Sequence, residues 1–211
     1  MSNFTYEAKD TKTKLETFEW DNVWWEHTEN TTAPRVLYIG DSISCGIRRV
    51  ATAKAENKIL FDGFGTSKAV DNPYFADTLK IFASQMSRCD AVIFNNGLHG
   101  FHLDDETEYK RHFEELVKFL IAEFEGTPVY IVLTTTVANP DREKRVTVRN
   151  KVALEIAEKY GLGVIDLYAA SVEAKELLTP DGVHFTPAGY EVLAKKVVGT
   201  LTAEVEALKV L

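Results

Sequence analysis

The chain has 211 residues, of which 45% are hydrophobic, so it is long enough for one substantial core and short for two. Its formal charge of -8 argues against a nucleic acid or an anionic membrane surface as a partner, because phosphate-binding proteins usually show a basic stripe. The first residues do not resemble a secretion signal, and no stretch reaches the ~18 apolar residues of a membrane span, so we expect a cytoplasmic protein.

The first segment, residues 1–34, carries all three tryptophans and has no clear periodicity. Three indoles in solvent would be costly, so we expect an N-terminal arm that packs on a domain formed by residues 35–211. The alternative is that Trp24 and Trp25 form a rim whose ring faces stack on a sugar. Both are therefore candidate substrate-binding residues.

Five short apolar runs follow, separated by stretches with helical periodicity, which is typical of a parallel sheet covered on both faces. The runs that predict strands are residues 36–39, 59–61, 91–94, 129–133 and 164–167. The stretches that predict helices are residues 44–57, 72–87, 104–124, 142–160 and 186–208. With right-handed crossovers they predict one flavodoxin-like α/β domain, a three-layer α/β/α sandwich with a doubly wound five-stranded parallel sheet in the order 2-1-3-4-5.

The first apolar run breaks at Gly40, and Asp41 and Ser42 follow where the helical pattern begins. A serine there stands at the carboxyl end of a strand, where open α/β sheets bind ligands, and at a helix N-terminus, which favours negative charge. This is a suitable place for a nucleophile whose attack creates an oxyanion. The alternative is a simple turn in which Asp41 and Ser42 only cap the helix.

Two further loops would open on the same edge of the sheet. The glycine of a Gly-x-Ser after the second run, Gly65, allows close backbone approach to a ligand. The loop after the third run contains Asn95, Asn96 and His99, which are either polar groups of a binding site or loop caps. His99 and His102 have the spacing of a loose metal site, but no further ligand cluster accompanies them, so we predict no metal.

Asp181 and His184 lie three residues apart in the loop before the last predicted helix. In a tight turn the carboxylate can reach the Nδ1–H of the imidazole, which leaves Nε2 to take a proton from a serine. The alternatives are an ordinary Asp-Gly turn and a surface or core histidine without a chemical role.

These motifs resemble, in order and spacing, the blocks of the SGNH (GDSL) hydrolases over roughly residues 35–193. The motifs are Gly-Asp-Ser at 40–42, Gly-x-Ser at 65–67, Gly-x-His at 97–99 and Asp-Gly-Val-His at 181–184. The resemblance implies that Ser42 is the nucleophile, His184 the general base and then acid, and Asp181 the carboxylate that orients His184. Asp41, also a candidate substrate-binding residue, is expected to shape the turn.

The resemblance also implies an oxyanion hole formed by the backbone N–H groups of Ser42 and Gly65 and a side chain from the third block. In this family that side chain is normally an asparagine, whereas here His99 stands in its place. A neutral imidazole can donate one hydrogen bond, so the role is chemically possible. Asn95 or Asn96 could supply an amide instead.

The sequence therefore predicts a carbohydrate-esterase-like member of this family. We expect a serine esterase that hydrolyses short-chain acyl, in particular O-acetyl, esters of small molecules or oligosaccharides, through an acyl-enzyme on Ser42 and with no cofactor. The short, polar loops at the site suit a small acyl group on a water-soluble alcohol. The alternatives are a thioesterase or lysophospholipase with the same triad, a non-catalytic carbohydrate-binding module, and a flavodoxin-like phosphate or nucleotide binder.

Overall fold

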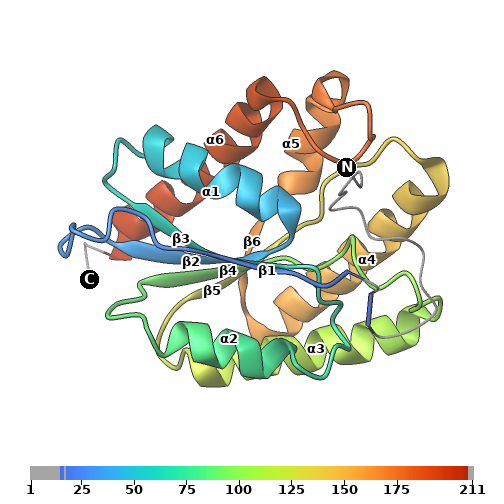
Figure 1. Cartoon of the computed structure of the whole chain (residues 1–211), viewed down its shortest axis with the longest axis horizontal. Helices are drawn as coiled ribbons and strands as arrows, with labels where there is room; N and C mark the ends of the chain where they lie inside the picture. Colours follow the sequence, from blue (N-terminus) through green and yellow to red (C-terminus); the bar gives the residue numbers. More distant parts are fainter. Residues whose placement is uncertain (1–14, 17, 209–211) are drawn as a thin grey trace.

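One six-stranded sheet runs through the middle of the molecule, and helices cover both of its faces (Figure 1). This computed structural model describes residues 15, 16 and 18–208. The strands are β1 (Asp21–Trp24), β2 (Arg35–Gly40), β3 (Leu60–Thr66), β4 (Ala91–Phe94), β5 (Val129–Val132) and β6 (Gly163–Ile165). The helices are α1 (Ser42–Lys54), α2 (Phe75–Ala83), α3 (Glu106–Glu123), α4 (Pro140–Tyr160), α5 (Leu167–Glu173) and α6 (Pro187–Leu208), with a 3-10 turn at Lys175–Leu177.

The strands lie in the order β1-β3-β2-β4-β5-β6, and β2 to β6 are parallel. The predicted α/β layers and the predicted order of the parallel strands are confirmed. The sheet nevertheless has one strand more than the five expected, because β1 pairs with β3 in the antiparallel direction. Three of the four residues of β1 are exposed, so this edge strand has none of the apolar alternation that predicts a strand.

The sheet separates two apolar cores because successive side chains of a strand point to opposite faces. Leu37 and Ile39 of β2 pack in the core on the side of α2, α3 and α4. Val36 and Tyr38 pack in the core on the side of α1 and α6. Figure 1 shows the same division, with α1, α5 and α6 on one face of the sheet and α2, α3 and α4 on the other.

Among the strand ends that differ from the prediction, two change the element to which a residue belongs. The second parallel strand, β3, continues to Thr66, so Gly65 lies inside the strand and not in a loop after it. The last strand is shorter than expected, since Leu167 already begins α5, whose N-cap Asp166 accepts a hydrogen bond from the backbone N–H of Ala169. Glycine is depleted in strands, which is why the pattern around Gly65 predicts a loop.

Candidate active site

Ser42 is the first residue of α1 and follows directly on β2. Asp41 caps the helix, because its Oδ1 accepts a hydrogen bond from the backbone N–H of Ile43 at 2.9 Å. The turn is tight at Gly40, where an added Cβ would lie 2.8 Å from Cβ of Ser44. These contacts fix Ser42 at the carboxyl edge of the sheet, and its backbone N–H is one of those that a helix start leaves without an intrahelical partner.

The turn before α6 is built around the carboxylate of Asp181. Its Oδ1 accepts hydrogen bonds from the backbone N–H groups of Val183 and His184 at 2.8 and 2.9 Å and from the hydroxyl of Thr179 at 2.9 Å. Gly182 makes the turn possible, with a φ of 73° that side chains rarely adopt. Burial alone would raise the pKa of Asp181, but these hydrogen bonds and that of the His184 ring hold its pKa far below the ordinary value.

The structure brings Ser42, His184 and Asp181 into one chain of contacts. Nδ1 of His184 lies 2.9 Å from Oδ2 of Asp181, and Nε2 lies 2.8 Å from Oγ of Ser42. An ionised carboxylate only accepts, so it draws the proton of the neutral ring to Nδ1 and leaves Nε2 as an acceptor for the serine hydroxyl. The arrangement can therefore pass a proton from Ser42 to His184.

A small hollow, partly open to solvent, lies beside this contact. Its polar lining includes Ser42, His99 and His184, together with two arginines of α4, Arg142 and Arg145. The rest of the lining is mostly apolar and is formed by Leu98, Phe101, Val137, Val146 and Val183. Mostly apolar walls with a few convergent polar groups are typical of a small-molecule site.

Gly65 and Asn95, two of the other predicted oxyanion donors, are engaged with neighbouring strands. Gly65 is paired on both sides, with Asn22 of β1 and Gly40 of β2, and Sγ of Cys45 occupies the space that a Cβ would need. Asn95 lies deeper between strands, where its amide nitrogen donates to the carbonyl oxygen of Val132 and to Oγ1 of Thr134. Both amide hydrogens of Asn95 are therefore already used.

The amide nitrogen of Asn96 donates to the backbone carbonyl oxygen of Lys68 at 2.7 Å. Within the described residues its Oδ1 is buried and has no hydrogen-bonding partner. Asn96 does not line the hollow beside Ser42. Of the three polar side chains predicted after the third parallel strand, only His99 does so.

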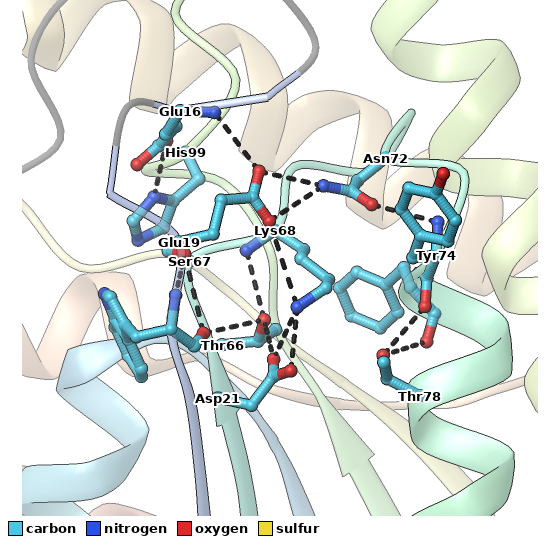
Figure 2. Close-up of polar contacts among 12 residues, drawn as sticks. Glu16, Glu19, Asp21, Thr66, Ser67, Lys68, Asn72, Tyr74, Thr78 and His99 are labelled. Atoms are coloured by element: carbon cyan, nitrogen blue, oxygen red, sulfur yellow. Dashed lines mark hydrogen bonds and ion pairs between the residues drawn. The ribbon is translucent and has the colours of Figure 1, made fainter.

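His99 makes a contact that sequence spacing does not predict. Its Nδ1 lies 3.0 Å from Oε1 of Glu16, a residue of the N-terminal arm 83 positions earlier (Figure 2). Both side chains are 8% exposed, and the edge of Trp20 also packs against the ring. Glu16 precedes any recognisable motif, so no signal in the sequence marks it as part of the site.

The candidate substrate-binding residues of the sequence lie away from the hollow. Trp25 stacks on Phe82, with ring centroids 4.3 Å apart, at the opposite end of the sheet from Ser42. Trp24 lies under the guanidinium groups of Arg48 and Arg49. Asp41 is 2% exposed and caps α1, as described above. Their contacts place the two tryptophans in the packing of the arm, and neither Asp41 nor a tryptophan lines the hollow.

Among the described residues, no group of three or more histidine, cysteine, aspartate or glutamate side chains could hold a metal ion. The two histidines that gave a loose metal pattern each face a carboxylate instead, His99 that of Glu16 and His102 that of Asp71. In the same part of the chain, no helix has both the length and the apolar character needed to cross a membrane.

Comparisons with known proteins identify the family of the chain. Residues 38–192 match the model of the GDSL-like Lipase/Acylhydrolase family. No curated protein sequence matches the chain.

Three solved structures share the fold over most of their length. A lipase/acylhydrolase from Enterococcus faecalis is 20% identical with a TM-score of 0.63, covering 81% of this chain and 96% of its own. An acetyl xylan esterase, AlAXEase, is 16% identical with a TM-score of 0.61, covering 79% and 98%. A carbohydrate acetylesterase from Sinorhizobium meliloti is 14% identical with a TM-score of 0.64, covering 81% and 99%. Since the family model spans most of the sequence, this chain belongs to the GDSL-like lipase/acylhydrolase family of ester-hydrolysing enzymes.

Proposed function

We propose that the protein is a serine esterase that hydrolyses short-chain acyl esters, in particular O-acetyl esters of carbohydrates, through an acyl-enzyme on Ser42. The observation that carries the proposal is the 2.8 Å contact between Oγ of Ser42 and Nε2 of His184, with Asp181 on the far side of the ring. A nucleophile, a base within hydrogen-bond reach and a third group that orients the base are the elements of covalent acyl transfer.

In the first half of the reaction, Oγ of Ser42 attacks the ester carbonyl carbon while Nε2 of His184 takes the hydroxyl proton. Asp181 stabilises the imidazolium that forms, and it keeps its own negative charge because its pKa lies far below neutrality. The carbonyl electron pair moves to oxygen, which gives a tetrahedral intermediate. When this intermediate collapses, His184 returns the proton to the leaving alcohol, and the acyl group stays on Ser42.

In the second half, water attacks the acyl-enzyme and gives a proton to the same Nε2. Collapse of the second intermediate releases the carboxylic acid and restores Ser42. The backbone N–H of Ser42 and the side chain of His99 are the oxyanion donors that we favour. The predicted contribution of Gly65 stays a prediction, since its peptide lies within the paired strands β1, β3 and β2.

Two observations support a small acyl group on a sugar. The hollow beside Ser42 is lined by apolar side chains, such as Leu98 and Val137, that suit a methyl group. Two of the similar solved structures are described as an acetyl xylan esterase and a carbohydrate acetylesterase.

The test is hydrolysis of p-nitrophenyl esters of increasing acyl length, together with acetylated xylo-oligosaccharides. We expect activity on acetate to exceed that on octanoate, and kcat to fall by roughly 10⁴-fold or more in Ser42→Ala and in His184→Ala. A fluorophosphonate probe should label the unmodified protein on Ser42. Ser84→Ala, which removes an exposed serine hydroxyl at the end of α2, is the control and should keep both the labelling and the activity.

Three results would contradict the proposal. Labelling of a residue other than Ser42 would exclude it as the nucleophile. Faster turnover of acyl thioesters or of long-chain lysophospholipids would favour the alternative enzymes. Binding of acetylated sugars with no turnover, unchanged in Ser42→Ala, would indicate a binding module.

A further inference from the structure

The contact between His99 and Glu16 limits what the ring can donate. A neutral imidazole carries one hydrogen, and an ionised carboxylate only accepts. While Glu16 is ionised and the ring is neutral, that hydrogen lies on Nδ1 and points at Oε1 of Glu16. Nε2 then has a lone pair and no hydrogen, so a neutral His99 cannot donate from Nε2 to an oxyanion.

Polar contacts attach the arm that carries Glu16 to the loop that follows β3 (Figure 2). The backbone N–H of Trp20 donates to Oγ of Ser67, and the backbone N–H of Ser67 donates to the carbonyl oxygen of Trp20. Nζ of Lys68 donates to both carboxylate oxygens of Asp21 at 2.8 Å. These contacts attach the arm to the sheet at Trp20 and Asp21, shortly after Glu16 in the chain.

A second contact restrains the carboxylates around His99. The backbone N–H of Glu16 donates to Oε1 of Glu19 at 3.1 Å, and Glu19 also accepts two hydrogen bonds from the amide of Asn72. Glu19 is thus turned toward the loop and remains close enough to act electrostatically on His99.

Charged groups on several elements lie close to His99 or act on it electrostatically. The carboxylates are Glu16 and Glu19 of the arm and Asp41 of the β2–α1 turn. The cationic or titratable groups are Arg142, Arg145 and His184, which line the same hollow, and Arg149, which binds the backbone of His99. Burial alone would lower the pKa of His99, but the hydrogen bond to Glu16 and the charges of Glu16, Asp41 and Glu19 outweigh it, so the pKa is raised.

The site thus holds two imidazole–carboxylate pairs whose imidazoles need different protonation states. His184 faces Asp181 and must be neutral, because its Nε2 takes the proton of Ser42. His99 faces Glu16, and its side chain lines the same hollow as Ser42 and His184.

We propose that His99 works as an imidazolium that Glu16 holds in place, and that its Nε2–H donates to the oxyanion that forms when Ser42 attacks the ester. The inference rests on the proposed function and deepens it. His99 keeps its proton throughout, since the proton of Ser42 goes to His184 and from there to the leaving alcohol. Glu16 is a positioning residue, because it acts through His99 and does not reach the reacting atoms.

The experiment is the pH dependence of kcat and KM for p-nitrophenyl acetate. In the unmodified protein kcat falls at high pH as His99 loses its proton. Glu16→Gln lowers the pKa of His99, so the falling limb moves to lower pH. Each unit of that shift reduces the imidazolium fraction about tenfold above the pKa, so we expect roughly a tenfold loss of kcat there with little change in KM.

His99→Asn is the second variant, because an asparagine amide donates at any pH. We expect its profile to lose the falling limb. This variant also carries the test if Glu16→Gln fails to fold. Glu125→Gln, which removes an exposed carboxylate in the turn after α3, is the control and should leave the profile unchanged.

A loss in Glu16→Gln by the same factor at every pH would overturn the inference, and so would a falling limb in His99→Asn at its original position. Either result leaves the proposed esterase intact. If instead the unmodified protein turns over no ester and a fluorophosphonate does not label Ser42, both proposals fail together.

Discussion

Nη1 of Arg149 donates a hydrogen bond to the backbone carbonyl oxygen of His99 at 2.6 Å. The same guanidinium donates to the carbonyl oxygens of Gly97, Gly100 and Leu103, and the Arg149 side chain is fully buried. An arginine of α4 therefore gathers the carbonyl groups of the loop that presents His99 to the hollow. Sequence spacing gives no sign of this role, because Arg149 lies 50 positions after His99.

Replacing Arg149 by methionine should destabilise the fold. The apolar side chain fills part of the space, but four buried carbonyl oxygens lose their donor, so we expect a loss of about 3–5 kcal/mol in the free energy of unfolding. The midpoint of urea unfolding measures it. Arg111→Met, at an exposed ion-paired arginine of α3, is the control and should change the free energy by about 0.5 kcal/mol or less. A similar small change in both variants would contradict the role of Arg149.

Asp181→Asn tests the orientation of His184. The amide can donate to Nδ1 and so favour the wrong tautomer, with the hydrogen on Nε2, where it cannot accept the proton of Ser42. We expect kcat on p-nitrophenyl acetate to fall on the order of 10³- to 10⁴-fold, as for the equivalent change in a serine protease. Retention of more than a tenth of the activity would show that the carboxylate is not needed to orient the ring.

The same substitution predicts a pH-dependent difference in stability. The pKa of Asp181 is lower in the folded protein than in the unfolded chain, so its ionised form stabilises the fold. This contribution is complete above the unfolded pKa of about 3.9 and is lost as the pH falls toward the folded value. The difference in urea midpoint between the unmodified protein and Asp181→Asn should therefore be constant near neutrality and shrink below about pH 4. A difference that is the same at all pH values would contradict this.

Gly97→Ala should destabilise the third block. An added Cβ would collide with Oγ1 of Thr134, which already accepts a hydrogen bond from Asn95, so we expect a loss of about 1–3 kcal/mol. Gly199→Ala on an exposed face of α6 is the matched control, because nothing lies within 4 Å of its added Cβ. There the better helix propensity of alanine should stabilise the fold by about 0.5–1 kcal/mol. Thermal unfolding should show shifts of opposite sign.

Trp25→Ala tests whether the Trp25 side chain packs against the core or binds a sugar. The indole stacks on Phe82 beside the core, and since Trp25 is only half-buried its loss should cost about 2–3 kcal/mol of stability. The KM for an acetylated xylo-oligosaccharide should not change, because Trp25 lies at the other end of the sheet from Ser42. A several-fold rise in KM in a folded variant would instead support the predicted aromatic rim.

Most of the sheet could be predicted because its parallel strands are buried on both faces and appear as short apolar runs. The strand β1 could not, since three of its four residues face solvent and it is held by pairing with β3 and by charges such as Asp21 on Lys68. The short helix α5 follows β6 after the single residue Asp166, which makes Leu167 look like part of that strand.

The residues of the proposed triad could be predicted because each stands in a short motif with a local reason for its place. Asp181 and His184 belong to one turn, and Ser42 to one strand-to-helix junction. Glu16 and Arg149 could not be predicted, because each reaches His99 only through tertiary packing. A motif identifies the reacting groups, whereas the groups that set their proton state lie wherever the fold brings them.

Ser42 and His184 stand 142 positions apart, near the two ends of the described chain. They meet only after the intervening strands have paired and α6 has docked on α1. A partly folded species with most of its helices formed is therefore silent in an ester assay. During refolding, turnover is expected to return after the far-ultraviolet circular dichroism signal has recovered, which makes hydrolysis a reporter of completed long-range assembly.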